Sequence, residues 1–247
     1  MYKKLSPNLL VVFTIITFLT NSLIRFSSMV TKIGEKAPNL KVSKWVQGMP
    51  TNIDKEKDNV VLVEVFQVNC PGCFLYGIPE AIEMYNKYHK DGLTVLGMAT
   101  AFEDFDKNTL ENLELLLSTG ETIGDTLNGL GQYGKLNGTK LSYKIPYPVA
   151  MDSLKKASDS LSQEKIMEVI DANIPNFESY NSEQKAELIE RVKQYLGSKE
   201  YSAETFEEYA LRGTPSSILI DKKGIVRDIS FGQNGMLESR IQSLLNE

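Results

Sequence analysis

The chain has 247 residues, enough for one elaborated domain or two small ones with a full hydrophobic core. Hydrophobic residues make up 42% of it and charged residues 24%, the composition of an ordinary globular protein. The formal net charge is −5 and the basic residues form no stripe, which argues against nucleic acid as a partner.

Residues 1–28 form a hydrophobic segment that differs from the rest of the chain. Residues 5–24 carry no charge, follow Lys3 and Lys4, and precede no Ala-x-Ala-like cleavage site, which favours an uncleaved membrane anchor over a removed signal peptide. The two lysines would hold the N-terminus in the cytoplasm and place the rest of the chain outside it. The alternative is that translation starts at Met29, which would make the protein cytoplasmic.

The globular part begins near Ile33, and residues 41–46 are expected to form a short edge strand. Residues 60–68 are β-branched or otherwise apolar, except Glu64 and Gln67. A run of this length without strict alternation predicts a strand buried on both faces, as in the middle of a parallel sheet.

This strand leads into Cys70-Pro71-Gly72-Cys73, after which apolar residues recur at helical spacing. Cys70 is therefore expected at the N-terminus of a helix, where the helix dipole and free N–H groups favour a thiolate and lower the cysteine pKa. Cys73, one turn further along, is placed to attack a mixed disulfide formed on Cys70. The order of the pair predicts that Cys70 is the exposed nucleophile and Cys73 the buried resolving thiol.

Metal-binding residues are scarce. Cys70 and Cys73 are the only cysteines, and the single histidine, His89, lies about four turns along the same helix, where we expect it to face solvent. The sequence therefore predicts no metal site, no structural disulfide elsewhere, and no cofactor beyond a redox-active Cys70–Cys73 disulfide.

The next segments alternate between strand and helix. Residues 93–99 predict a second strand, Asn108 can cap a leucine-rich helix, and residues 147–151 predict a short third strand. Residues 120–138 hold six glycines and no convincing periodicity. Because they lack the Gly-x-x-x-x-Gly-Lys-Ser/Thr pattern of a phosphate-binding loop, we expect a mobile loop there.

Residues 152–208 are interpreted as a helical insertion. They contain 7 basic and 13 acidic residues, a net charge of −6, so the acidity of the protein belongs to this segment. A solvated surface is the favoured interpretation, and a docking face for a partner is the alternative.

After Gly213-Thr214-Pro215, two apolar runs flank a glycine-containing turn and predict a hairpin over residues 216–231, followed by an amphipathic helix over residues 236–245. The full order is strand, Cys-x-x-Cys helix, strand, helix, insertion, hairpin and helix. This order predicts an α/β, thioredoxin-like three-layer sandwich with a mixed central sheet and a helical insertion before the Thr214–Pro215 loop.

The chain resembles the redoxin branch of the thioredoxin superfamily, and most of all the TlpA-like thiol–disulfide oxidoreductases, roughly over residues 33–151 and 209–247. The matching motifs are Gly34-Glu35-Lys36-Ala37-Pro38, Cys70-Pro71-Gly72-Cys73, Ile145-Pro146-Tyr147-Pro148 and Arg212-Gly213-Thr214-Pro215. The resemblance implies one redoxin domain over residues 33–247 with a cis Thr214–Pro215 bond beside the cysteines.

The resemblance also implies the site residues and the partners. Pro215 would complete the catalytic site, and Thr214, Pro71 and Gly72 would contact the substrate. The expected partners are protein thiols or disulfides, together with an upstream reductant or oxidant.

Glu64 lies six residues before Cys70, where thioredoxins carry a buried acid that moves protons to and from the inner cysteine. A carboxylate in an apolar strand is costly unless its pKa rises, which suits a proton donor and acceptor near neutral pH. The alternative is that Glu64 lies at the sheet rim and meets water or a lysine.

Two departures from the family pattern stand out. Asn69 replaces the tryptophan usual before the first cysteine, which puts the partner-binding surface in question. Pro79 follows Cys73 by six residues rather than five, so the helix kink is expected to differ.

Two other function classes fit the sequence less well. A peroxiredoxin-like thiol peroxidase with an antioxidant role needs Pro-x-x-x-Thr-x-x-Cys, but counting back from Cys70 gives Val63 and Gln67 at the proline and threonine positions. A redox-inactive binding module has little need of two cysteines in this geometry. Thiol–disulfide exchange is therefore the predicted function.

Overall fold

The computed structural model describes residues 31–156 and 162–247. Within these ranges, no helix is both long enough and apolar enough to cross a membrane. The apolar residues 5–24 lie outside them, so the membrane anchor and the location outside the cytoplasm stay predictions.

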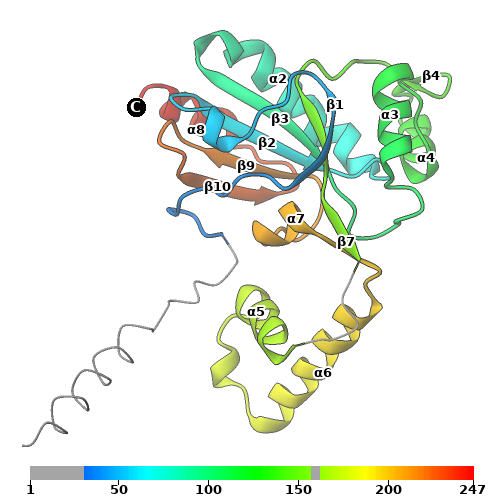
Figure 1. Cartoon of the computed structure of the whole chain (residues 1–247). Helices are drawn as coiled ribbons and strands as arrows, with labels where there is room; N and C mark the ends of the chain where they lie inside the picture. The colour runs from blue at the N-terminus through cyan, green and yellow to red at the C-terminus, as the bar shows by residue number, and fades with distance from the viewer. Residues whose placement is uncertain (1–30, 157–161) are drawn as a thin grey trace, which may run out of the picture.

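A six-stranded mixed sheet forms the centre of the molecule (Figure 1). In sheet order, the strands are β1 (Val42–Gln47), β6 (Val149–Asp152), β3 (Leu93–Ala99), β2 (Val60–Phe66), β9 (Ser216–Ile220) and β10 (Val226–Phe231). β2 pairs in parallel with β3 and antiparallel with β9. All seven residues of β2 are buried, as its unbroken apolar run predicts.

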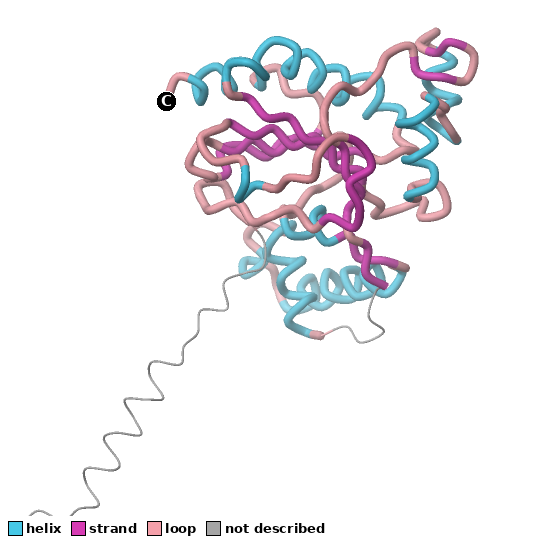
Figure 2. Tube along the Cα trace, turned by 45° about the horizontal axis from the view of Figure 1, so that its top comes forward, coloured by secondary structure: helices cyan, strands magenta, loops and turns pink. Residues whose placement is uncertain are grey.

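Helices cover both faces of this sheet (Figures 1 and 2). Successive residues of a strand point to opposite faces, so Leu62 and Phe66 pack with α2 (Ile78–Tyr88), α3 (Leu110–Thr119) and α8 (Leu237–Leu245). Val61 and Val63 pack on the other face with α7 (Glu204–Glu208). This arrangement confirms the predicted three-layer α/β sandwich.

The glycine-rich segment 120–138 is not the loop that the sequence suggests. It forms α4 (Gly124–Gln132) and, with the next residues, a small hairpin of β4 (Leu136–Asn137) and β5 (Lys140–Leu141). Leu130 and Thr126 of α4 are fully buried, and the Thr126 hydroxyl donates to the carbonyl oxygen of Val68. The sequence pattern did not predict this helix because it has few apolar residues and several glycines, so no helical periodicity could be recognised.

The predicted cap of α3 is also wrong by one residue. Thr109 caps this helix, because its hydroxyl oxygen accepts from the backbone N–H of Asn112. Asn108 turns instead toward the cysteine motif, where its side-chain oxygen accepts from the backbone N–H of Asn69.

Residues 152–208 leave the sheet on a short two-stranded stem. β7 (Leu154–Lys156) pairs antiparallel with β8 (Tyr201–Ala203), and α5 (Gln163–Asn173), η4 (Phe177–Ser179) and α6 (Ser182–Ser198) lie beyond it (Figure 1). The two long helices enclose a small apolar cluster of their own, formed by Ile166, Ile170, Phe177 and Leu196.

Asp152, at the end of β6, connects the last part of this insertion, α7, to the sheet through hydrogen bonds. Its carboxylate accepts from the backbone N–H groups of Thr205 and Phe206, in the first turn of α7, and from the hydroxyl of Thr100. The side chain is fully buried, and burial raises its pKa although these hydrogen bonds oppose the shift.

We expect Asp152→Ala to lower the free energy of unfolding by about 2–4 kcal/mol, because it leaves buried N–H groups without an acceptor. Asp152→Asn keeps one acceptor oxygen and should cost less than half as much. Urea unfolding followed by circular dichroism measures both. Equal losses in the two variants would show that the acceptor role is unimportant.

Candidate active site

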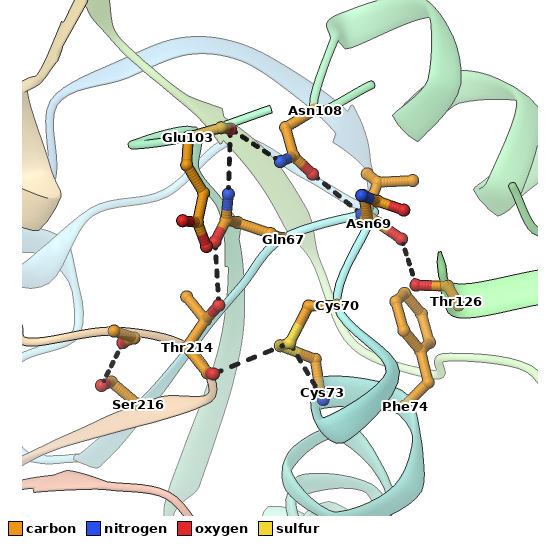
Figure 3. The surroundings of a disulfide bond; sticks show 12 residues. Gln67, Asn69, Cys70, Cys73, Phe74, Glu103, Asn108, Thr126, Thr214 and Ser216 are labelled. Carbon is orange, nitrogen blue, oxygen red and sulfur yellow. Dashed lines mark hydrogen bonds between the residues drawn. A yellow bond between two sulfur atoms is a disulfide. The ribbon is translucent and has the colours of Figure 1, made fainter. Parts of the chain in front are cut away.

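The two cysteines form a disulfide where β2 gives way to the helix, with their Cα atoms 5.4 Å apart (Figure 3). Cys70 is partly exposed and directly precedes the first helical residue, whereas Cys73 is fully buried. The backbone N–H of Cys73 points at the Sγ atom of Cys70, 3.2 Å away. This difference in exposure favours the roles predicted for the pair, which stay predictions.

The Thr214–Pro215 bond is cis and lies beside the disulfide, as the family resemblance implies. The carbonyl oxygen of Thr214 is 3.7 Å from the Sγ atom of Cys70 (Figure 3). A Cβ atom placed on Gly72 would lie 3.8 Å from the ring of Pro215, so the predicted residues Gly72, Thr214 and Pro215 meet around the sulfur atoms.

Pro71 faces a different neighbour. A Cβ atom on Gly129 would come within 2.8 Å of its ring, so Pro71 packs against α4 and remains only partly exposed. Its predicted contact with substrate is therefore limited to the part of the ring that α4 leaves open.

The extra residue between Cys73 and Pro79 is absorbed by a π-helical turn, η2 (Cys73–Gly77), ahead of α2. The N–H of Ile78 donates to the carbonyl oxygen of Cys73, five residues back. The next donor in that pattern would be Pro79, which has no N–H. The carbonyl oxygen of Phe74 accepts instead from the hydroxyl of Tyr143, at 2.7 Å.

We expect Tyr143→Phe to destabilise the protein by about 1–3 kcal/mol, since it leaves the Phe74 carbonyl without this donor. Tyr133→Phe is the matched control, because the Tyr133 side chain is 64% exposed. Thermal and urea unfolding would compare the two variants. A Tyr143→Phe protein as stable as the control would mean that water replaces the hydroxyl.

Glu64 lies beneath the start of the cysteine helix and not at the sheet rim. Its side chain is on the face of β2 that packs against α2, and it is 3% exposed. A Cβ atom on Gly77 would lie 2.2 Å from the Oε1 atom of Glu64 and 2.6 Å from the Cβ of Pro215. The helix, the acid and the cis proline therefore converge at one point.

Burial raises the pKa of Glu64 well above its ordinary value, and the nearby charge of Glu80 adds to the shift. Among the described residues, nothing donates a hydrogen bond to its Oε1 atom. The Tyr147 hydroxyl is a second buried group without a partner there, and burial followed by the charge of Glu64 raises its pKa. Its ring packs over Gly97, which pairs with Glu64 across the sheet.

The raised pKa of Glu64 predicts how stability depends on pH. Above about pH 4.5 the unfolded chain loses this proton while the folded chain keeps it, so wild type loses stability as pH rises through the folded-state pKa. Glu64→Gln removes this loss. Between about pH 4.5 and the folded-state pKa of Glu64, the free energy of unfolding of the variant should rise relative to wild type by about 1.4 kcal/mol per pH unit. Urea unfolding from about pH 5 to 9 measures this difference.

The same variant tests the predicted proton transfer. Disulfide exchange by Glu64→Gln should be slower than wild type near neutral pH. Rate profiles that superimpose between about pH 6 and 9 would leave Glu64 with a structural role only.

The side chain of Asn69 is buried and held by hydrogen bonds on several sides. It is 8% exposed, its side-chain N–H donates to Asp104, and its side-chain oxygen accepts from the backbone N–H of Asp125 at the start of α4. The backbone N–H of Asn69 also donates to the side chain of Asn108 (Figure 3). Together these hydrogen bonds fix the loop that carries Cys70.

Gln67 holds the cis-proline loop in place. The Thr214 hydroxyl donates to its side-chain oxygen at 3.1 Å, and its side-chain N–H donates to the carbonyl oxygen of Glu103 at 3.2 Å (Figure 3). The sequence marked Gln67 only as a polar residue in an apolar strand. The position of this amide within an apolar run was the one feature of the sequence that indicated a structural role.

His89 is exposed at the end of α2, and its ring stacks on Tyr85 with the centroids 4.5 Å apart. Within residues 31–156 and 162–247, no group of three or more His, Cys, Asp or Glu side chains is arranged to hold a metal ion.

No protein-family model matches the sequence, and no curated protein matches it. Solved structures do. A protein of the thioredoxin-like superfamily is 25% identical, with a TM-score of 0.53 over 86% of this chain and 97% of its own. A thiol–disulfide isomerase from Corynebacterium glutamicum is 25% identical, with a TM-score of 0.52 over 87% of this chain and 97% of its own.

The fold and the disulfide site thus define a protein of the thioredoxin-like class. The comparisons confirm the predicted resemblance to thioredoxin-like thiol–disulfide oxidoreductases. The narrower likeness to the TlpA-like branch stays a prediction.

Proposed function

We propose that the protein is a TlpA-like thiol–disulfide oxidoreductase that exchanges electrons with protein partners through Cys70 and Cys73. The observation that carries this proposal is the asymmetry of the pair, with a partly exposed sulfur at the helix start and a fully buried one behind it. The Cys70–Cys73 disulfide serves as the redox group. An upstream reductant or oxidant resets it after each turnover.

The reaction needs two exchanges. In the dithiol state, the thiolate of Cys70 attacks one sulfur of a substrate disulfide, and the other substrate sulfur leaves as a thiolate and takes up a proton. The thiol of Cys73 then loses its proton and attacks the Sγ atom of Cys70, which releases the second substrate thiolate. This thiolate also takes up a proton, and the Cys70–Cys73 disulfide is formed. The substrate thus gains two electrons and two protons, one proton given up by Cys73 and one that Cys70 released to solvent when its thiolate formed. Run in reverse, the same steps oxidise a substrate dithiol.

Three groups assist these steps. The free N–H groups at the helix start favour the thiolate of Cys70. Glu64, whose pKa burial raises well above its ordinary value, gives its proton to the departing thiolate of Cys73 when the Cys70–Cys73 disulfide opens, and its carboxylate accepts the proton of Cys73 when the disulfide forms. The Thr214–Pro215 loop forms the surface over which the substrate chain approaches the sulfur atoms.

Peroxidase activity is not favoured. The position where a peroxiredoxin carries its threonine is Gln67, whose amide is engaged by Thr214 and by Glu103. Gln67 itself has no hydroxyl to orient a peroxide, and the nearby Thr214 hydroxyl donates to the Gln67 side chain.

We expect Cys73→Ser to trap mixed disulfides between Cys70 and its protein partners, because the resolving thiol is gone. Cys70→Ser is the matched control and should trap little, since Cys73 is fully buried. Non-reducing electrophoresis after acid quenching detects the adducts. Trapping of the same partners through Cys73 in the control would reverse the assignment of the two cysteines.

A further inference from the structure

A groove of about 800 Å³ separates the insertion from the sheet domain. One wall is the connection after β3, with Phe102 and Phe105, and the other is the end of α6, with Tyr195 and Leu196. Phe206 of α7 lies between them and stacks on Phe102, with the ring centroids 4.5 Å apart. Aromatic rings therefore line both sides of the groove.

One end of the groove adjoins the disulfide site. Glu103 lines it, and the carbonyl oxygen of this residue accepts from Gln67, which in turn holds Thr214. Arg212 also lines it and precedes Thr214 by two residues, a span of about 7 Å in an extended chain. A polypeptide crossing the Thr214–Pro215 loop thus reaches the groove within a few residues.

The charges inside the groove are matched to one another. Lys165 and Lys199 both pair with Glu207, at 3.3 and 3.2 Å, and Lys165 also lies 3.9 Å from Glu168, the second acid on this side of the groove. At the end near the disulfide, Glu103 and Arg212 have opposite signs, and neither has an ion-pair partner among the described residues. A ligand therefore meets no net charge here, and the aromatic walls select for apolar groups.

We propose, resting on the function above, that the groove receives a large apolar side chain located about two to four residues from the target cysteine of a substrate protein. The substrate class is then proteins whose reactive cysteine lies in an apolar segment that is accessible in an extended form. Continuity between the groove and the cis-proline loop favours this occupant over a free small molecule.

The test uses peptides in which one cysteine is joined to a chromogenic thiol. They carry Trp or Ser two, three or four residues from the cysteine, on either side. With the reduced full-length protein, we expect the best Trp peptide to react about fivefold to tenfold faster than its Ser partner in kcat/KM. Peptides with Asp or Lys at the same position should differ from each other by less than twofold.

Two matched variants test whether the preference for Trp peptides arises in the groove. Tyr195→Ser removes an aromatic wall at a half-exposed position and should reduce the Trp preference to less than twofold. Tyr180→Ser removes an exposed tyrosine of the same insertion outside the groove and should leave the preference intact. An unchanged preference in Tyr195→Ser, or a charge preference larger than the apolar one, would overturn the proposal.

Two further outcomes separate the hypotheses. If wild type reduces neutral bis(2-hydroxyethyl) disulfide but shows no Trp preference, the groove proposal fails and the oxidoreductase function stands. If it reduces neither that disulfide nor any peptide, the proposed function itself fails. A dimer that dissociates on Tyr195→Ser would assign the groove to a second copy of the chain and overturn the proposal.

Discussion

The site depends on how closely the cysteine helix approaches the sheet at Gly77. No side chain fits there, since even a Cβ atom would overlap Glu64 and crowd Pro215. This approach brings the cis proline against the disulfide and also removes water from the carboxylate beneath it. The raised pKa of Glu64 and the position of Pro215 thus have one cause, close packing at a glycine.

The geometry of the helix follows from the same approach. Pro79 leaves the Phe74 carbonyl without a helical donor, and the π-helical turn accommodates the additional residue before the proline. A buried carbonyl without a donor would cost about 1–3 kcal/mol, so the hydrogen bond from the hydroxyl of Tyr143 stabilises the start of the helix. The cysteines and prolines belong to the family motifs, but the π-helical turn between Cys73 and Pro79 and its hydrogen bond from Tyr143 are not part of those motifs.

Residue patterns predicted the parts of the fold that local chemistry determines. The apolar runs over residues 60–68 and 93–99 contain β2 and β3, with β2 ending two residues before the predicted end, and the cysteines lie at the start of the helix as expected. The contacts that position the site were not predictable in this way. Tyr143 and Phe74 are 69 residues apart, and Gln67 and Thr214 are 147 apart, so no periodicity connects them. α4 was missed because its glycines diluted a short apolar pattern.

The order of the strands explains why the insertion lies close to the disulfide site. It lies in the connection from β6 to β9, and that connection ends in the Thr214–Pro215 loop. Helices inserted there return the chain to the sheet beside the disulfide, held by Asp152. None of the insertion's net charge comes from the side chains that line the groove, because Lys165 and Lys199 there are balanced by Glu168 and Glu207. An acidic exterior and an apolar groove wall thus occupy different faces of one insertion, so its net charge says little about what its inner face can bind.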